Sequence, residues 1–443
     1  MTHPEIVLVV GEIIVDFTLS QNESGCKLRL GGVVHAARGL WAAGLEYAIA
    51  AFCPEYLVEN AKQFLSAHGC KDFHWLGNVV GAPNVIVIGE VTELAHQGYE
   101  DLLRDEKQIK WLNPLPDLAE YRRVIVFPGK FELSQLSSLF SPDAQITFDI
   151  AYDIDDVSSI SEFNGRVQTL IISTSSELFA KHGGDTVDGL IRQSRNVASN
   201  FLLLKENRGG SRLFNLQDGS VEEIPATLGH TCNSVGVGDV YSAVMVGLAH
   251  LGWVEAAWRG CQAATAYSQT TYPDDLKRDL TRAFKLSLET LRSLGGTALP
   301  WHDRQLYSIY LAGPDFSYVE KAELDHALRS LTYHNFKLRR PIIEHGELVR
   351  PASEGDLLRT YHRDYELLKG CDAIFAIPLE RDPGTLVEIG MAIALGKPVV
   401  TYDPRHENNN TMVVAGSSVY SSALDTCLNG MFNVLAELRA AKS

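Results

Sequence analysis

The sequence lacks closely spaced cysteines and long apolar runs. Its seven cysteines stand far apart, and no two of them form a Cys-x-x-Cys pair. Neither a zinc site nor a disulfide framework is therefore expected, and reduced thiols point to a cytoplasmic protein. The first apolar run, Ile6 to Val10, is broken by Gly11 and Glu12 and then by Asp16. It is too short and too polar for a signal peptide or a membrane span.

Positive charge is also scarce. The chain has 39 Lys and Arg against 55 Asp and Glu, which gives a net charge of −16. Because no Lys/Arg cluster offsets this balance, binding to nucleic acid or to an anionic membrane is disfavoured, and small-molecule ligands are expected. Apolar residues make up 45% and charged residues 21%, an ordinary globular composition. At 443 residues the chain exceeds the usual size of one domain, so two or three domains are expected.

What is present is a glycine-rich turn at residues 233–239, Asn-Ser-Val-Gly-Val-Gly-Asp, followed by an apolar run to Gly247. A helix that starts at Asp239 would leave its first N–H groups and the positive end of its dipole facing the turn. Such a turn suits phosphate oxygens, and Asp239 is placed to take a proton from an attacking hydroxyl. A plain loop-to-helix junction with Asp239 as a cap is an equally weighted alternative.

This turn resembles the second signature of the ribokinase-like (PfkB) carbohydrate and nucleoside kinases, usually Asp-Thr-x-Gly-Ala-Gly-Asp. The two glycines and the final aspartate are kept, while Asn233 and Ser234 stand at the Asp-Thr positions. The resemblance implies that Asp239 is the catalytic base and that ATP and Mg²⁺ are the cofactors. The implied anion hole consists of the N–H groups of Gly236, Val237 and Gly238.

The N-terminal segment adds a second resemblance to the same family. Residues 5–16 predict a buried strand with a polar end, and residues 31–44 predict a glycine turn followed by a helix of small residues. The family has a first strand that ends in a sugar-binding Asp and a helix that starts with Gly-Gly-x-x-x-Asn. The implied substrate-binding residues are Asp16, Gly31, Gly32 and His35. His35 stands where the family usually has Asn.

Further strands indicate the architecture of this half. Short apolar strands at 123–129, 145–149 and 169–173, each followed by helix-like sequence, predict a parallel sheet covered by helices on both faces. Residues 17–30 and 84–93 predict the small lid sheet of such kinases. The family's Asn-x-x-Glu motif has Thr174 at its first position and keeps its glutamate. The resemblance implies contacts to nucleotide or magnesium from Glu177, Lys205 and Gly210.

A linker is predicted after this half. Apolar positions at helical spacing in residues 279–294 indicate an amphipathic closing helix. Two glycines and a proline follow within residues 295–300, as is typical of a linker. We therefore expect a ribokinase-like domain at 1–296, with a doubly wound parallel sheet and a small lid, and a second domain at 304–443.

The second domain begins with a new strand and a Gly-Pro turn at residues 306–315. A strand at 371–378, a helix at 382–396 and a strand at 397–402 form a βαβ unit. A smaller Rossmann-like, flavodoxin-like α/β domain is expected, with ligands beyond the carboxyl ends of its strands. Glu388 lies in an apolar stretch near a helix start, which favours a buried nucleophile or acid/base group. A structural partner for Lys397 is the alternative.

Residues 306–415 resemble the nucleoside 2-deoxyribosyltransferase family, which includes the 2′-deoxynucleoside 5′-phosphate N-hydrolases. The matching elements, in order, are Tyr310-Leu-Ala-Gly-Pro, Asp364, Asp372, Asp382-x-Gly-Thr-x-x-Glu388-x-Gly, Gly396-Lys-Pro and Asn410-Thr-Met412. The resemblance implies that Glu388 attacks the sugar C1′ and forms a glycosyl-enzyme ester. Asp364 and Asp382 would contact and help protonate the base, and Tyr310 would orient Glu388. Gly313 and Gly384 would line the substrate site.

In this family the motif at Asn410 and Met412 reaches into a neighbouring subunit's site, so a homo-oligomer is expected. No cofactor is implied for the second domain, and no metal site is predicted from the residues themselves. His345, His362 and His406 are isolated in the sequence and are expected at the surface or behind the site. Four arginines are either 5′-phosphate ligands or, as we favour, solvated charge: Arg339, Arg340, Arg359 and Arg363.

The sequence thus predicts a bifunctional nucleoside- or nucleotide-processing enzyme. The C-terminal domain would cleave or exchange an N-glycosidic bond, as a transferase if a second base accepts the sugar and as an N-glycosidase if water does. The N-terminal domain would be an ATP-dependent sugar or nucleoside kinase, or a degenerate derivative changed at His35, Thr174 and Asn233. One alternative is a nucleotide- or NAD-degrading N-glycosidase whose kinase-like domain only binds ligand and regulates. A nucleotide-binding module without catalysis is the non-enzymatic alternative.

Overall fold

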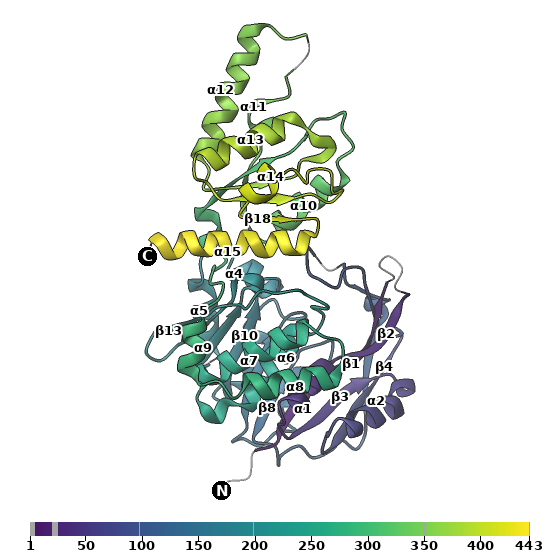
Figure 1. Cartoon of the computed structure of the whole chain (residues 1–443). Coiled ribbons are helices and arrows are strands. Elements are labelled where there is room, and N and C mark those ends of the chain that lie inside the picture. The colour runs from purple at the N-terminus through teal and green to yellow at the C-terminus, as the bar shows by residue number, and fades with distance from the viewer. Residues whose placement is uncertain (1–4, 20–24, 97, 198, 349–350, 443) are drawn as a thin grey trace. The chain divides into compact units, whose positions relative to one another are not determined.

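One long strand, β1 (Val7–Thr18), belongs to two sheets and organises the N-terminal half of the chain. The computed structural model describes residues 5–19, 25–96, 98–197, 199–348 and 351–442. It contains two units, both drawn in Figure 1. The first comprises Met1–Glu93, Gln97–Thr227 and Thr231–Ala298, and the second comprises Leu94–His96, Leu228–His230 and Leu299–Ser443.

The first half of β1 lies in the middle of the main sheet of the first unit. The other strands of this sheet are β3 (Tyr47–Cys53), β4 (Phe73–Val80), β7 (Gln108–Trp111), β8 (Arg123–Val126), β9 (Gln145–Ile150), β10 (Val167–Ser173), β11 (Phe201–Lys205), β12 (Ser211–Asn215) and β13 (Val221–Ile224). Their order is β13-β12-β11-β10-β9-β8-β1-β3-β4-β7. The strands from β11 to β4 in this order are parallel, and only the outer pairs are antiparallel. The predicted parallel sheet is confirmed.

The second half of β1 lies in a smaller lid sheet. This sheet also contains β2 (Lys27–Gly32), β5 (Val85–Ile88) and β6 (Glu100–Asp101). Residues 13–18 pair with β2 in antiparallel fashion, and residues 15–18 pair with β5 in parallel. The lid sheet predicted from residues 17–30 and 84–93 is therefore confirmed, apart from residues 20–24, which lie outside the described residues.

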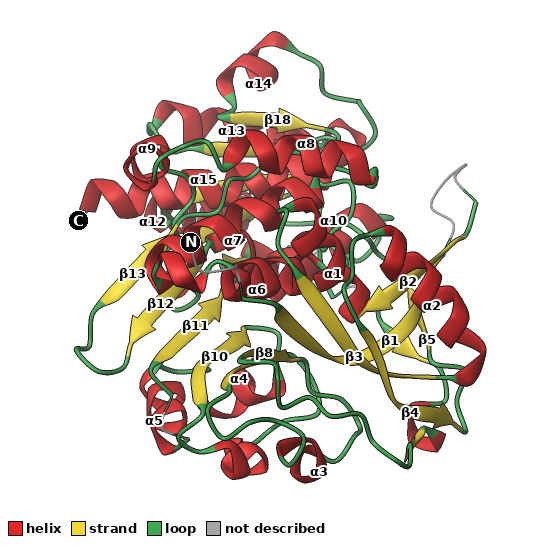
Figure 2. Ribbon diagram, turned by 90° about the horizontal axis from the view of Figure 1, so that it is seen from below, coloured by secondary structure: helices red, strands yellow, loops and turns green. Residues whose placement is uncertain are grey.

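Helices cover both faces of the main sheet. They are α1 (Val33–Ala42), α2 (Glu55–Ala67), α3 (Leu133–Ser137), α4 (Glu177–His182), α5 (Asp188–Asn196), α6 (Val237–Gly247), α7 (Trp253–Ser268), α8 (Pro273–Ala283) and α9 (Leu288–Leu294), with 3₁₀ turns η1 (Arg104–Glu106), η2 (Val157–Phe163), η3 (Asn207–Gly209) and η4 (Ala249–Leu251). Figure 2 shows α1, α6, α7 and α8 on one face and α3, α4 and α5 on the other. This arrangement confirms the predicted doubly wound α/β class, and it explains why the central strands are apolar on both faces.

The prediction of a single closing helix at residues 279–294 is wrong in one respect, because the chain forms two helices there, α8 and α9. The Ser287 hydroxyl accepts a hydrogen bond from Thr290 N at 3.1 Å and so starts a new helix inside the predicted one. Leu280 and Leu291 are nevertheless buried in one core cluster. The apolar spacing predicted the buried face and missed the break.

The second unit is built on a five-stranded, all-parallel sheet. Its strands are β14 (Ser308–Ala312), β15 (Lys337–Arg339), β16 (Ala373–Ala376), β17 (Val399–Tyr402) and β18 (Val419–Ser421). Their order is β15-β14-β16-β17-β18, and every pair is parallel. Counted along the chain this is 2-1-3-4-5, the flavodoxin-like order, and it confirms the predicted smaller Rossmann-like fold. The order reverses between β14 and β16, where ligands of such sheets bind.

Alternation along β14 directs one residue toward the predicted site. The helices of this unit are α10 (Ala322–Tyr333), α11 (Pro341–His345), α12 (Glu354–Gly370), α13 (Pro383–Ala394), α14 (Thr411–Gly416) and α15 (Leu424–Lys442), with η5 (Asp303–Leu306) and η6 (Leu379–Arg381). Ile309 and Leu311 belong to the core cluster that contains α15 residues, whereas Tyr310 belongs to the opposite cluster with Ile389 of α13. Tyr310 therefore faces α13, the helix that carries Glu388. No helix among the described residues combines the length and apolar character needed to cross a membrane.

Candidate active sites

The predicted glycine turn of the first unit lies against α1 at the start of α6. Gly236 precedes the helix with φ 82°, a left-handed conformation that favours glycine. A Cβ on Gly236 would lie 2.2 Å from the ring of His35, so the turn and this ring are in close contact. Val237 N donates to the Ser234 carbonyl at 3.2 Å. The next two N–H groups, of Gly238 and Asp239, have no backbone acceptor among the described residues, so they are the donors open to an anion.

Asp239 lies in the first turn of α6 and is partly exposed. Burial of the carboxyl group raises the pKa of Asp239 to about 7. The Asp149 carboxylate raises this pKa as well, the Lys205 ammonium lowers it, and Asp16 has a further raising effect. A carboxyl group with a pKa near neutrality suits proton acceptance during catalysis.

Lys205, predicted to contact nucleotide, makes an ion pair inside the protein. Its Nζ lies 2.7 Å from Asp149 Oδ2 and 3.0 Å from Oδ1. Ser242 Oγ donates to Asp149 Oδ2 at 2.6 Å. The sequence indicated Asp149 only as the end of an apolar strand and Ser242 only as a small residue in an apolar helix. Both were missed because their partners come from elements far apart in the chain.

Asp16, predicted to bind substrate, is buried among side chains of the chain itself. Its Oδ2 lies 2.9 Å from His35 Nε2 and 3.0 Å from Arg29 Nε. His35 Nδ1 lies 2.8 Å from the Tyr267 hydroxyl. Burial lowers the pKa of His35 to about 4, so the ring is neutral at pH 7. We assign its proton to Nε2, facing Asp16, with Nδ1 accepting from Tyr267. Burial raises the pKa of Asp16, but His35 and Arg29 together lower it below its ordinary value.

Arg29 and the remaining predicted residues link this group to the glycine turn. Arg29 NH2 lies 3.2 Å from the Val235 carbonyl and 3.4 Å from Asn233 Oδ1. Gly31 lies in β2 against Asp16, since a Cβ there would lie 2.1 Å from Asp16 Oδ1, and Gly32 ends β2 and directly precedes α1. The structure thus brings the substrate-binding set and Asp239 into one region: Asp16, Gly31, Gly32, His35, Gly236, Val237, Gly238 and Asp239.

Glu177 and Gly210 are less directly connected with Asp239. Glu177 is exposed in the first turn of α4, where Ser176 caps the helix. Gly210 lies in the turn between η3 and β12. No hydrogen bond or ion pair joins either residue to Asp239 within the described part of the chain. Their predicted contacts to nucleotide and magnesium remain predictions.

The residues at the start of α6 fit a phosphate group. The helix N-terminus is positive, and the N–H groups of Gly238 and Asp239 lie there without a backbone acceptor among the described residues. Thr174 Oγ1, next to β11, is buried without a hydrogen-bond partner among the described residues. Magnesium is usually held by one or two carboxylates together with phosphates, so Glu177 has suitable chemistry. Among the described residues, no group of three or more His, Cys, Asp and Glu is arranged to hold a metal ion.

In the second unit, Tyr310 and Glu388 form the short hydrogen bond that the resemblance implied. The Tyr310 hydroxyl donates to Glu388 Oε1 at 2.5 Å, from β14 to the second turn of α13. Burial raises the pKa of Glu388 to about 8. The bond from Tyr310 lowers this pKa, while the negative charges of Asp364 and Asp382 raise it. Burial and the Glu388 charge also raise the pKa of Tyr310, which keeps its proton for this bond.

The two predicted base-contacting aspartates lie near Glu388 but have different neighbours. Asp382 precedes α13, and its Oδ2 accepts from Thr385 N at 2.7 Å and from Thr385 Oγ1 at 2.8 Å. Asp364, on α12, lies with its Oδ1 2.7 Å from His345 Nδ1. His345 is therefore a partner of the site and not an isolated surface residue. No local sequence signal indicated this pair, because the two residues belong to different helices.

The other predicted substrate contacts lie in the second unit at the ends of its helices and strands. Gly313 follows β14, Gly384 lies in the first turn of α13, and Asn410 caps α14 by accepting from Met412 N at 2.9 Å. Met412 is 78% exposed.

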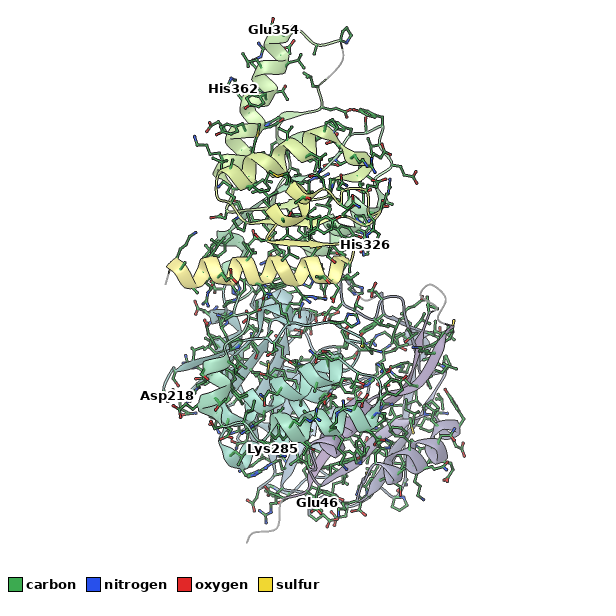
Figure 3. The ribbon with its side chains drawn as sticks, viewed as in Figure 1. Glu46, Asp218, Lys285, His326, Glu354 and His362 are labelled. Atoms are coloured by element: carbon green, nitrogen blue, oxygen red, sulfur yellow. The ribbon has the colours of Figure 1, made fainter. Side chains whose placement is uncertain are left out.

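Asp372 accepts from Ser308 N at 2.9 Å and so fixes the start of β14. The exposed residue His362 is labelled on α12 in Figure 3, and His406 is exposed as well.

Three of the four arginines considered as phosphate ligands have a carboxylate partner. Arg339 binds Glu344 through two contacts of 2.6 Å. Arg340 binds Asp315 at 2.6 and 3.0 Å. Arg359 contacts Asp356, and Arg363 is exposed. A 5′-phosphate on any of the first three would have to displace a carboxylate, which supports the interpretation as surface charge.

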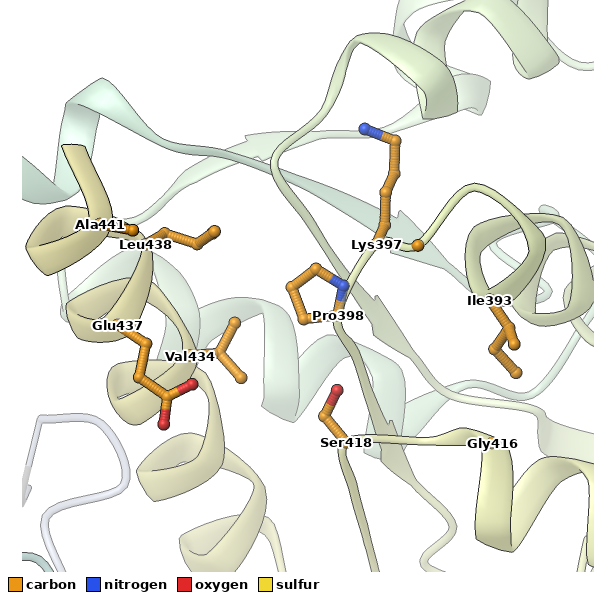
Figure 4. A pocket seen from close by; sticks show the side chains of 10 residues that line it. Ile393, Lys397, Pro398, Gly416, Ser418, Val434, Glu437, Leu438 and Ala441 are labelled. Atoms are coloured by element: carbon orange, nitrogen blue, oxygen red, sulfur yellow. The ribbon is translucent and has the colours of Figure 1, made fainter.

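A pocket of about 540 Å³ opens elsewhere in the second unit, between α13, α15 and the start of β17 (Figure 4). Ile393, Lys397 and Val434 are among its lining residues. Lys397 Nζ donates to the Cys371 carbonyl at 2.5 Å and is not paired with Glu388. No predicted catalytic residue lines this pocket, so it is separate from the Glu388 site.

Comparison with known proteins gives a family match for the second unit. Residues 309–429 match the family model described as nucleoside 2-deoxyribosyltransferase, so the chain contains a domain of that family at its C-terminal end. No curated protein matches the chain.

Solved structures that are similar to the chain include three kinases. The nucleoside kinase of Methanocaldococcus jannaschii, an archaeal member of the ribokinase family, is 15% identical, with 63% of this chain and 98% of that chain covered and a TM-score of 0.45. Giardia lamblia ribokinase is 13% identical, with 63% and 99% covered and a TM-score of 0.48. Arabidopsis thaliana ribokinase, complexed with ribose and ATP, is 13% identical, with 64% and 100% covered and a TM-score of 0.47.

The raised pKa of Glu388 predicts a pH-dependent stability. The folded state keeps the Glu388 proton up to about pH 8, whereas the ordinary pKa of a glutamate is 4.5. The free energy of unfolding therefore falls as the pH rises from 4.5 to about 8. Glu388→Gln removes the titration, so its advantage over the native chain should grow with pH to the order of 3 kcal/mol. Urea unfolding at pH 5, 7 and 9 measures this. Glu366→Gln, at an exposed position of α12, is the control, and equal pH trends for both variants would contradict the assignment.

Proposed function

We propose that the second unit cleaves or exchanges the N-glycosidic bond of a (deoxy)nucleoside or nucleotide, with Glu388 as the nucleophile. The observation that carries this proposal is the 2.5 Å hydrogen bond from Tyr310 to Glu388, beside the apolar cluster that contains Tyr310 and Ile389. A partly buried carboxylate held by a hydroxyl donor is oriented for attack and costs stability, as expected of a functional group and not of a structural one. The family match of residues 309–429 supports the same chemistry.

In the first step, a Glu388 oxygen forms a bond to C1′ while the bond between C1′ and the base nitrogen breaks. The electron pair of the broken bond stays on the base, and a proton from the Asp364–His345 pair neutralises it. The product is a glycosyl ester of Glu388. In the second step, a nucleophile attacks C1′ and the ester bond to Glu388 breaks. The proton of the nucleophile passes to Asp364. The configuration at C1′ is retained through two inversions.

Attack requires Glu388 to be ionised. With a pKa of about 8 in the free protein, most of the carboxyl groups are protonated at pH 7, and activity should rise toward pH 8. The hydrogen bond from Tyr310 favours the carboxylate and so opposes the effect of burial. Asp382 has its Oδ2 bound to Thr385, so it would contact the base while fixing the start of α13.

The acceptor in the second step decides the name of the reaction. A second base gives a nucleoside deoxyribosyltransferase, and water gives an N-glycosidase. We infer a homo-oligomer in which Asn410 and Met412 reach a neighbouring site, a proposal supported by the exposure of Met412 and consistent with its position on α14. A cytoplasmic location is part of the proposal.

For the first unit we propose an ATP-dependent sugar or nucleoside kinase. When bound, ATP would supply the phosphoryl group that is transferred. Asp239 would accept the proton of the attacking hydroxyl, and the start of α6 would hold phosphate charge. Glu177 and Gly210 would contribute to nucleotide or magnesium binding, and Asp16 and His35 to the acceptor, whereas Lys205 is engaged by Asp149.

One observation favours a different role for this unit. The groups expected to meet ligands already have partners of their own, since Asp16 binds Arg29 and His35, and Lys205 binds Asp149. In the alternative, the kinase-like unit binds a ligand without phosphoryl transfer and regulates an N-glycosidase that degrades nucleotides or NAD.

The products of the second unit can be measured by chromatography. The native protein is incubated with deoxynucleosides, deoxynucleotides and NAD, each with and without a second free base. We expect Glu388→Gln to lose turnover by a factor on the order of 10³ or more, because it removes the nucleophile, and Glu366→Gln to keep it.

A new nucleoside formed only with the second base would establish transfer. Base released without an acceptor would establish hydrolysis, and release from NAD would favour the degrading alternative. Turnover that persists in Glu388→Gln would contradict the proposed nucleophile.

Phosphoryl transfer by the first unit is tested by ADP formation from ATP with a panel of sugars and nucleosides. Asp239→Asn should lower the rate by about 10² to 10⁴, because the general base is lost, and should leave ATP binding intact. The control is Asp218→Asn, at the exposed residue labelled in Figure 3. ATP binding without acceptor-dependent ADP formation would reject the kinase and favour the regulatory alternative.

A further inference from the structure

We propose that Asp149, Lys205 and Ser242 form a positioning cluster that holds the first turn of α6 and controls how readily Asp239 takes up a proton. The proposal rests on the proposed role of Asp239 as the catalytic base of the first unit. None of the three residues would contact the acceptor substrate. Each would act through Asp239 and the backbone beside it.

The cluster joins three elements of the first unit. Lys205 ends β11, Asp149 lies near the end of β9, and Ser242 lies on α6. Lys205 Nζ is within 3.0 Å of both Asp149 oxygens and 3.4 Å from the Gly238 carbonyl. Ser242 Oγ lies 2.6 Å from Asp149 Oδ2. The peptide immediately before Asp239 is therefore connected to two strands of the main sheet.

The contacts of Lys205 distinguish this role from nucleotide binding. An ammonium group has three N–H donors, and four acceptors surround this one: the two Asp149 oxygens, Ser242 Oγ at 3.3 Å and the Gly238 carbonyl. Its donors are thus used inside the protein. The side chains of Lys205 and Asp149 are 13% and 1% exposed, and charges in such surroundings act strongly on their neighbours.

The two charges of the cluster act on Asp239 in opposite directions. Burial is the largest cause of its raised pKa, the Asp149 charge raises this pKa as well, and the Lys205 charge lowers it. The other groups that face Asp239 or its turn are Asp16 from β1, Arg29 from β2, His35 from α1, and Tyr99 and Tyr152 from loops. Substitutions within the cluster leave all of these in place, so the effect of each charge can be isolated.

The experiment compares Asp149→Asn, the double variant Asp149→Asn with Lys205→Met, and Ser242→Ala. Phosphoryl transfer needs ionised Asp239, so its rate rises with pH through the pKa of this group. In Asp149→Asn only the positive charge of Lys205 remains. The rise of the phosphoryl-transfer rate should therefore move to lower pH by about one unit. In the double variant both charges are absent, and the rise in rate should lie between that of Asp149→Asn and that of the native protein, because the Asp149 charge has the larger effect on Asp239. Ser242→Ala keeps both charges and should leave it unmoved.

These expectations separate positioning from a merely structural role. A structural role would lower the rate in all three variants without this ordered movement. Lys205→Met alone is avoided, because it would leave Asp149 buried without a counter-ion and endanger folding. If Asp149→Asn does not fold, Lys205→Arg keeps the charge, and its rise should stay at the native pH.

A second readout needs no turnover. The free energy of unfolding of each variant is measured against pH, with and without Asp239→Asn, and the difference reports protonation of Asp239. If the midpoint of this pH dependence moves as described while no phosphoryl transfer is found, the proposed role of the cluster is supported and the proposed kinase activity is rejected. If phosphoryl transfer occurs and neither the pH profile of the rate nor the midpoint moves, the proposed role of the cluster is rejected and the proposed kinase activity is supported. A midpoint that moves to higher pH in Asp149→Asn would also overturn the cluster.

Discussion

Burial of a carboxyl group next to a single hydroxyl donor is the constraint on which the second unit depends. The interior disfavours the charge of Glu388, and Asp364 and Asp382 disfavour it further, while Tyr310 is its one hydrogen-bond donor among the residues that the structure describes. A side chain of the same shape without charge would be more stable in this position. The sheet order places Tyr310 on the face of β14 that meets α13, so the fold itself creates this destabilising arrangement, which nucleophilic attack would use.

The first unit also contains a carboxyl group with a raised pKa, but its neighbours differ from those of Glu388. Asp239 is also a carboxyl group with a pKa raised toward neutrality, but an ion pair of opposite charges lies beside it instead of a single donor. Its neighbours Asp16 and His35 are held in a closed set of contacts with Arg29 and Tyr267. The substituted positions His35 and Asn233 both belong to this set of contacts. Two of the three departures from the motif that the sequence resembles therefore lie in a single packed network.

The sequence predicted features that depend on neighbours along the chain. Apolar runs indicated the parallel strands, and the apolar context of Glu388 indicated a buried carboxylate. Its bond to Tyr310, 78 residues away, came only from the family resemblance. The pairs Asp364–His345 and Asp149–Lys205 were not predicted, because they join elements whose adjacency is fixed by strand order and helix packing. The break at Ser287 was missed for a local reason, since a capping hydroxyl can start a helix inside an otherwise periodic stretch.

The central claim is that Glu388 forms a covalent bond to the sugar of an N-glycoside. The most direct measurement is the mass of the protein after incubation with a deoxynucleoside or deoxynucleotide and rapid acid quenching, followed by peptide mapping. The account predicts that the peptide containing Glu388 gains the mass of one glycosyl group and that Glu388→Gln gains none. Release of base with no adduct on Glu388, or with an adduct on another residue, would contradict it.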